Sequence, residues 1–120
     1  ILLRKPGVDM TVSIETVKDI QIIHVEYKSL DASKVEEFLK KVSDDITQNN
    51  KNLIDLSRVD FVDSAGLGSL LSCLKKAKTN NGNLKLYGLT KSVRSLFELM
   101  RMQKIFSIYD NKEMAIASYE

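Results

Sequence analysis

Two alternating segments near the start of the chain predict an antiparallel pair of strands. Val12, Ile14 and Thr16 alternate with more polar neighbours, which is typical of a half-exposed strand. A turn at 18–19 separates them from a run at 20–27 that is rich in β-branched residues. Because the link is so short, we expect the two strands to form a hairpin.

After the hairpin, the apolar positions recur with the period of a helix. Ser33 and Glu36 have the S-x-x-E spacing of a capping box, so we expect this helix to begin there. Asn49-Asn50 should end it. The apolar side chains that share one face of this helix are Val35, Phe38, Leu39, Val42 and Ile46.

The rest of the chain alternates between short strands and helices. We expect Asp110 and Glu113, in a D-x-x-E pattern, to start the last helix. Strand–helix alternation with short links implies right-handed crossovers and a mainly parallel sheet. The sequence therefore predicts one α/β domain: a mainly parallel sheet of four to five strands, an antiparallel N-terminal hairpin strand and about four helices. The remaining predicted elements are a strand at 51–56, a helix from about Ser64, a strand at 84–87, a helix at 91–102, a strand at 105–109 and a helix through Tyr119.

Residues 1–9 show no sustained period and contain the only proline. We interpret them as a leader, or as residues added before a native start at Met10, with the domain covering 10–120. No run approaches about 20 apolar residues, and no signal peptide is visible, so no membrane insertion is expected. Cys73 is the only cysteine, which predicts a packing thiol, no internal disulfide and a cytoplasmic location.

The composition agrees with a globular domain that does not bind nucleic acid directly. A hydrophobic content of 43% in 120 residues suits a single core. The formal charge of +2 is close to neutral, so we interpret Lys75, Lys76 and Lys78 as the solvated end of a helix and not as a nucleic-acid patch.

The most distinctive segment is D-S-A-G-L-G at 63–68, which follows an apolar strand and opens a helix. Asp63 and Ser64 are both favourable residues at a helix start. Gly66 and Gly68 each cost about 1 kcal/mol relative to alanine in a helix interior. Two such glycines indicate a close approach, either by a partner or by another part of this chain. From the spacing alone, a plain helix cap is the simpler interpretation.

A hydroxyl at Ser64 would nevertheless suit a phosphorylation switch. Helix N-termini favour anions, so the folded protein would tolerate a phosphate there. Phosphorylation adds about −1.5 to −2 charge, and a charge left buried and unpaired at an interface costs several kcal/mol. Because each ~1.4 kcal/mol is tenfold in affinity, one phosphate is sufficient to weaken a complex about a hundredfold.

Catalytic and cofactor sites have little support in the sequence. His24 is the only histidine and lacks metal-ligand spacing, so we interpret it as a surface strand residue and expect no metal site. A serine hydrolase would need a base beside Ser64, and V-D-S-A-G differs from G-x-S-x-G. Gly66-x-Gly68 lacks the third glycine of a dinucleotide fingerprint. We expect neither an enzyme nor a bound cofactor.

Over residues 10–120 the order of elements resembles the STAS domain, in particular the bacterial anti-sigma factor antagonists. The segment at 63–68 is similar to their phosphorylation motif D-S-[SA]-G-[LI]-G, and Leu30-Asp31-Ala32-Ser33 is similar to their L-D-[AS]-x segment. The segments 84–89 and 105–109 resemble later strands of the family. One departure is Tyr27-Lys28-Ser29, where family members often carry a glycine.

The resemblance implies a partner-switching regulator of transcription. Ser64 would be phosphorylated by an anti-sigma factor with serine kinase activity, and a PP2C-type phosphatase would reverse the reaction. The unmodified protein would bind the anti-sigma factor and thereby free the sigma factor. An alternative within the family is an adaptor of a membrane transport system for lipids or anions. The residues implied to contact the partner or to shape the site are Asp31, Asp63, Ser64, Ala65, Gly66, Leu67 and Gly68.

Overall fold

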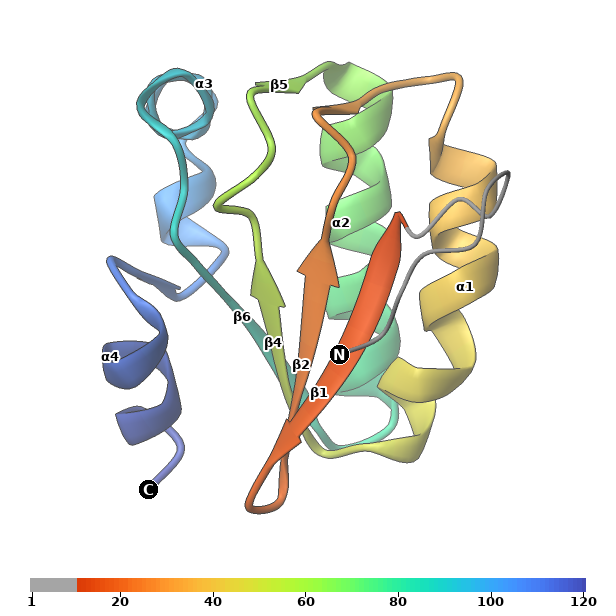
Figure 1. The fold of residues 1–120 in the computed structure, drawn as a ribbon, viewed down its shortest axis with the longest axis vertical. Coiled ribbons are helices and arrows are strands. Elements are labelled where there is room, and N and C mark those ends of the chain that lie inside the picture. Colours follow the sequence, from red (N-terminus) through yellow and green to blue (C-terminus); the bar gives the residue numbers. More distant parts are fainter. Residues whose placement is uncertain (1–10) are drawn as a thin grey trace, which may run out of the picture.

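The computed structural model describes residues 11–120, so the leader predicted at 1–9 and the start predicted at Met10 lie outside the described residues. Five strands form one mixed sheet in the order β1-β2-β4-β6-β7 (Figure 1). β1 and β2 form the predicted antiparallel hairpin, and the other neighbours pair in parallel. The predicted fold class is confirmed. The strands are β1 (Val12–Val17), β2 (Ile20–Val25), β4 (Lys51–Asp55), β6 (Asn83–Tyr87) and β7 (Ile108–Tyr109).

Four helices pack around this sheet. α1 (Val35–Gln48) and α2 (Ser64–Thr79) lie side by side on one face, where their apolar stripes form the main core with the strands (Figure 1). α4 (Lys112–Ala117) packs on the opposite face through Ala115. Because β4 is covered on both faces, its central residues are all buried, as is usual for a parallel strand.

A second, two-stranded sheet was not predicted. β3 (Ser29–Leu30) pairs in parallel with β5 (Phe61–Val62), beyond the carboxyl ends of the main strands (Figure 1). Strands of two residues carry no periodic signal, because one alternation is too short to detect. This small sheet joins the segment after β2 to the segment before α2.

The start of α1 differs from the predicted capping box. Lys34 occupies the cap position and makes no side-chain capping hydrogen bond. Ser33 instead donates from both its hydroxyl and its backbone N–H to the Asp31 carboxylate. The capping-box prediction is therefore wrong, because a neighbouring carboxylate engages the serine before the helix begins.

The C-terminal elements are shorter than predicted. α3 (Lys91–Leu99) stops before 102 because Arg101 takes a left-handed backbone conformation, with φ of 58°. A 3-10 turn, η1 (Met102–Lys104), follows, so only the last two residues of the strand predicted at 105–109 pair in the sheet. α4 is capped by Asn111 and not by Asp110, and it ends at Ala117 and not at Tyr119.

Candidate functional site

Ser64 is the first residue of α2, and a single residue separates it from β5. Its side chain is exposed. The N-terminus of α2 lies beside β3 and β5, beyond the carboxyl ends of β2, β4 and β6 (Figure 1). In open α/β sheets this edge is where ligands commonly bind. Ser64 is therefore exposed to solvent at this edge of the sheet.

The Asp63 side chain holds the start of α2, where Ser64 lies, against a neighbouring loop. One carboxylate oxygen accepts a 2.8 Å hydrogen bond from the backbone N–H of Gly66, which caps α2. The other oxygen accepts a 3.0 Å hydrogen bond from the backbone N–H of Ala32, in the segment after β3. One side chain thus ties the helix start to a loop that is 31 positions away in the sequence.

Asp31 organises that loop. Its carboxylate accepts hydrogen bonds from the Ser33 and Ser29 hydroxyls and lies 3.3 Å from the Lys34 ammonium group. These contacts, the Ser33 hydroxyl foremost, hold the pKa of Asp31 well below its ordinary value. Asp31 therefore stays ionised and paired with Lys34, in the loop that Asp63 holds through Ala32.

The two glycines of the segment have different surroundings. A Cβ at Gly66 would collide with the carbonyl oxygen of Leu30, so α2 approaches β3 as closely as a glycine allows. At Gly68, apart from its chain neighbours and the nearby backbone of α2 itself, no heavy atom of residues 11–120 lies within 4 Å of a built Cβ. The close approach indicated by the sequence is thus made within the chain at Gly66. Gly68 leaves an open surface one helical turn beyond Ser64.

The other predicted site residues divide by burial. Leu67 is 5% exposed and belongs to the main core, and Gly66 is buried as well. Ala65, Asp31 and Asp63 are half-buried. The exposed residues of this segment are Ser64 and Gly68. Leu67 and Gly66 therefore pack inside the protein, below the surface on which Ser64 is exposed.

Phe61 is a surface residue that the sequence reasoning missed. It alternates with buried Val62 on β5, and its side chain is 56% exposed three positions before Ser64. An aromatic residue two positions before the D-S pair that opens the helix was the available signal.

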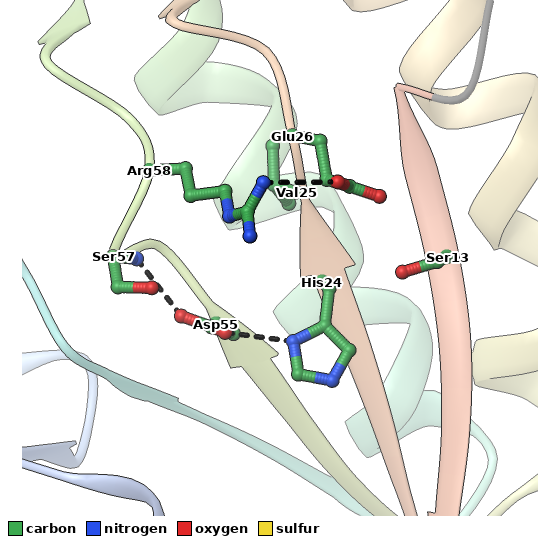
Figure 2. Close-up of a pocket in the computed structure, with 7 residues that line it drawn as sticks. All are labelled: Ser13, His24, Val25, Glu26, Asp55, Ser57 and Arg58. Atoms are coloured by element: carbon green, nitrogen blue, oxygen red, sulfur yellow. Dashed lines mark hydrogen bonds and ion pairs between the residues drawn. The ribbon is translucent and has the colours of Figure 1, made fainter. Parts of the chain in front are cut away.

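His24 lies in a separate polar network on the α4-facing side of the sheet. Its Nδ1 is 2.7 Å from an Asp55 oxygen, and its Nε2 is 2.7 Å from a Glu15 oxygen. Figure 2 shows Asp55 reaching His24 from the end of β4, within a cavity of about 370 Å³. His24 is half-buried, and both ring nitrogens contact carboxylates. It is therefore not the base that a hydrolase centred on Ser64 would need.

The pKa values of the two carboxylates in this network, Glu15 and Asp55, are both shifted. Burial alone would raise the pKa of Asp55, but hydrogen bonds from Ser57 and His24 outweigh it, and the pKa is lowered. The pKa of Glu15 is also lowered, first by its hydrogen bond with Lys112 and then by that with His24. Both side chains are thus held as anions: Asp55 binds His24 on the neighbouring strand, and Glu15 links the sheet to α4 through Lys112.

The described part of the chain lacks the features of two other kinds of site. Across residues 11–120, no three histidine, cysteine, aspartate or glutamate side chains converge as metal ligands. None of the helices in this range combines the length and the apolar character needed to cross a bilayer. Cys73 is buried, as predicted.

Comparison with known proteins finds a matching family model and named relatives. The family model for the STAS domain matches residues 11–115. The anti-sigma-B factor antagonist of Listeria monocytogenes is 31% identical over 107 residues, covering 82% of this chain and 90% of that protein. A Bordetella bronchiseptica protein provisionally named anti-sigma factor antagonist BtrV is 34% identical over 68 residues, or 57% of this chain and 59% of that protein.

Solved structures agree on the fold. A crystal structure of a Thermotoga maritima protein, provisionally described as an anti-sigma factor antagonist, superposes with a TM-score of 0.79. The two sequences are 24% identical, and the match covers 91% of this chain and 94% of that one.

Proposed function

The chain belongs to the STAS domain family, and from that premise we propose that it is an anti-sigma factor antagonist controlled by phosphorylation of Ser64. In the unmodified state it binds the anti-sigma factor, which then releases its sigma factor. In the phosphorylated state it leaves the complex. The names of the Listeria and Bordetella relatives support this role.

The phosphoryl transfer uses this chain only as acceptor. The Ser64 oxygen attacks the γ-phosphorus of ATP held by the anti-sigma factor kinase, the serine proton passes to a base of that kinase, and ADP leaves. A PP2C-type phosphatase then hydrolyses the serine phosphate to inorganic phosphate. Neither step needs a cofactor or a catalytic residue from this chain, and we infer that the protein is a cytoplasmic regulator and not an enzyme.

The observation that carries the proposal is the exposed Ser64 hydroxyl at the first position of α2, on a base fixed by Asp63. The dipole of α2 favours an anion there, so the phosphate is compatible with the fold. At an interface the same phosphate must be desolvated or repelled, which weakens the complex.

The test is binding to the cognate anti-sigma factor, together with phosphate incorporation from ATP. We expect Ser64→Ala to bind like the wild type and to accept no phosphate, and Ser64→Asp to bind about a hundredfold more weakly. Ser107→Asp, at an exposed serine before β7, is the charge control and should bind normally. Equal binding by the Ser64→Ala and Ser64→Asp variants would contradict the proposal. Recovery of a permease complex without a kinase would favour the adaptor role.

A further inference from the structure

Two of the most exposed apolar side chains lie on β5, which leads into Ser64, and on α3, which packs against β5. Phe61 on β5 is 56% exposed, and Leu99 at the end of α3 is 79% exposed. Large apolar groups left in water indicate an interaction surface when they belong to one continuous face. Whether Phe61 and Leu99 share a face depends on how α3 sits against β5.

Hydrogen bonds anchor the start of α3 to the chain that leads into Phe61. The Thr90 hydroxyl donates to the Val59 carbonyl oxygen at 2.9 Å, and the Ser92 hydroxyl donates to the Asp60 carbonyl oxygen at 2.7 Å. α3 also packs directly against β5. The helix therefore starts beside Phe61.

α3 turns one stripe toward solvent and the opposite one into the core. Val93 and Phe97 are buried, whereas Ser92, Ser95 and Leu99 are exposed at helical spacing. At 1.5 Å per residue, Ser92 and Leu99 lie about 10 Å apart along the helix axis. The exposed stripe thus runs from the neighbourhood of Phe61 to Leu99.

A partner whose binding is controlled by Ser64 must contact a surface much larger than this one side chain. A stable interface buries about 800 Å² on each protein. Such a footprint, placed on Ser64, extends well past a residue that lies three positions away along the chain. Gly68, one helical turn beyond Ser64 on α2, is exposed and has no side chain. It therefore presents no bulk that would keep a partner from approaching Ser64.

We propose that the docking face for the anti-sigma factor runs from Ser64 across Phe61 to the exposed stripe of α3, and that an apolar surface of that partner covers Phe61 and Leu99. This inference rests on the proposed function. It also gives the phosphate a mechanism: a charge on Ser64 stands beside an apolar contact, where it would be desolvated without a counter-charge. Phe61 is then a specificity-determining residue at the centre of the face, and Leu99 lies toward its rim.

The test measures binding of the unmodified protein to the anti-sigma factor by calorimetry, with ATP left out so that Ser64 stays free. Central aromatic side chains dominate interfaces, so we expect Phe61→Ser to weaken binding by about 10- to 100-fold and Leu99→Ser by about 3- to 10-fold. Met114→Ser, at a 49% exposed side chain on α4, is the matched control and should bind like the wild type. Urea unfolding of each variant should match the wild type, because all three side chains are exposed.

A double-mutant cycle tests the coupling to the switch. The Ser64→Asp penalty, about a hundredfold in the wild type, should fall below about tenfold in the Phe61→Ser background, because contacting sites are not additive. Normal binding and phosphorylation of the wild type, with unchanged binding by Phe61→Ser and Leu99→Ser, would overturn the extended face alone. A changed oligomeric state with unchanged binding would assign the face to a second copy of this chain and would also overturn it. Failure of the wild type to bind would overturn the proposed function as well.

Discussion

At the residue scale, Gly66 and Gly68 have different roles although they are two positions apart in one helix. Gly66 is required by the packing of α2 on the Leu30 carbonyl oxygen. Gly68 meets no such constraint within residues 11–120, and it lowers helix stability by about 1 kcal/mol relative to alanine. A residue that weakens the fold without an internal reason is best explained by an approaching partner.

This contrast gives a prediction for a matched pair of variants. Gly66→Ala should lower the free energy of unfolding by about 1–3 kcal/mol, because the added methyl group overpacks against β3. Gly68→Ala should raise it by about 0.5–1 kcal/mol while weakening binding to the anti-sigma factor. Urea unfolding and calorimetry measure the two effects. A change of the same sign in the unfolding free energy of both variants would contradict the different roles given to Gly66 and Gly68.

Asp63 gives a second prediction at this scale. Asp63→Ala removes the acceptor for both the Gly66 and the Ala32 N–H groups, so we expect a loss of about 1–2 kcal/mol in unfolding free energy. Asp63→Asn keeps one accepting oxygen and should lose less. Urea unfolding of the three proteins decides this, and an Asp63→Ala variant as stable as the wild type would show that neither hydrogen bond matters.

At the scale of elements, the His24 network joins β1, β2 and β4 to α4. Glu15 on β1 accepts hydrogen bonds from Lys112 at 3.0 and 2.8 Å, and it also contacts His24 on β2. His24 in turn contacts Asp55 on β4. A helix as short as α4 has little stability of its own, so contacts of this kind help to hold it on the sheet.

The network predicts a dependence of stability on pH. The pKa values of Glu15 and Asp55 are lowered in the folded protein, so the unfolded chain binds protons more readily. The stabilisation is complete above the ordinary pKa values of 4.5 and 3.8, and it is lost as the pH falls below them. Lys112→Met should flatten this acid dependence in urea unfolding. Lys75→Met, on the exposed end of α2, is the control, and an equal effect of both variants would contradict the role of the network.

At the scale of the whole molecule, the sheet gathers the elements of the proposed switch at one edge. The carboxyl ends of β2 and β4 lead into the segments that form β3 and β5, and these segments support the start of α2 (Figure 1). Ser64 is exposed at the start of α2 and does not belong to the hydrophobic core. A charge on Ser64 therefore alters a surface and leaves the packed interior unchanged.

The corresponding prediction separates loss of binding from loss of folding. Ser64→Asp should unfold within about 1 kcal/mol of the wild type, because an anion at a helix N-terminus contributes only about 0.3–1 kcal/mol. Thermal unfolding followed by circular dichroism measures this. A variant that lost both binding and several kcal/mol of stability would mean that the switch works by unfolding.

The sequence by itself determined the order and type of the main elements and the placement of Ser64 at a helix start. The β-branched alternation before Val25 and the helical period after Val35 are local signals, set by which face of each segment is apolar. Strand–helix alternation then left few arrangements other than a parallel sheet. The D-S pair before the second helix was readable for the same reason, because capping depends on near neighbours.

Only the tertiary structure decided the contacts between segments that are distant in sequence. The pairing of β3 with β5, the hydrogen bond from Ala32 to Asp63, and the collision that requires Gly66 each join positions about 30 or more residues apart. The exposure of Phe61 and the contacts of His24 with two carboxylates were settled in the same way. A periodic pattern reports the faces of one element, whereas these features depend on which neighbour the folded chain brings against each face.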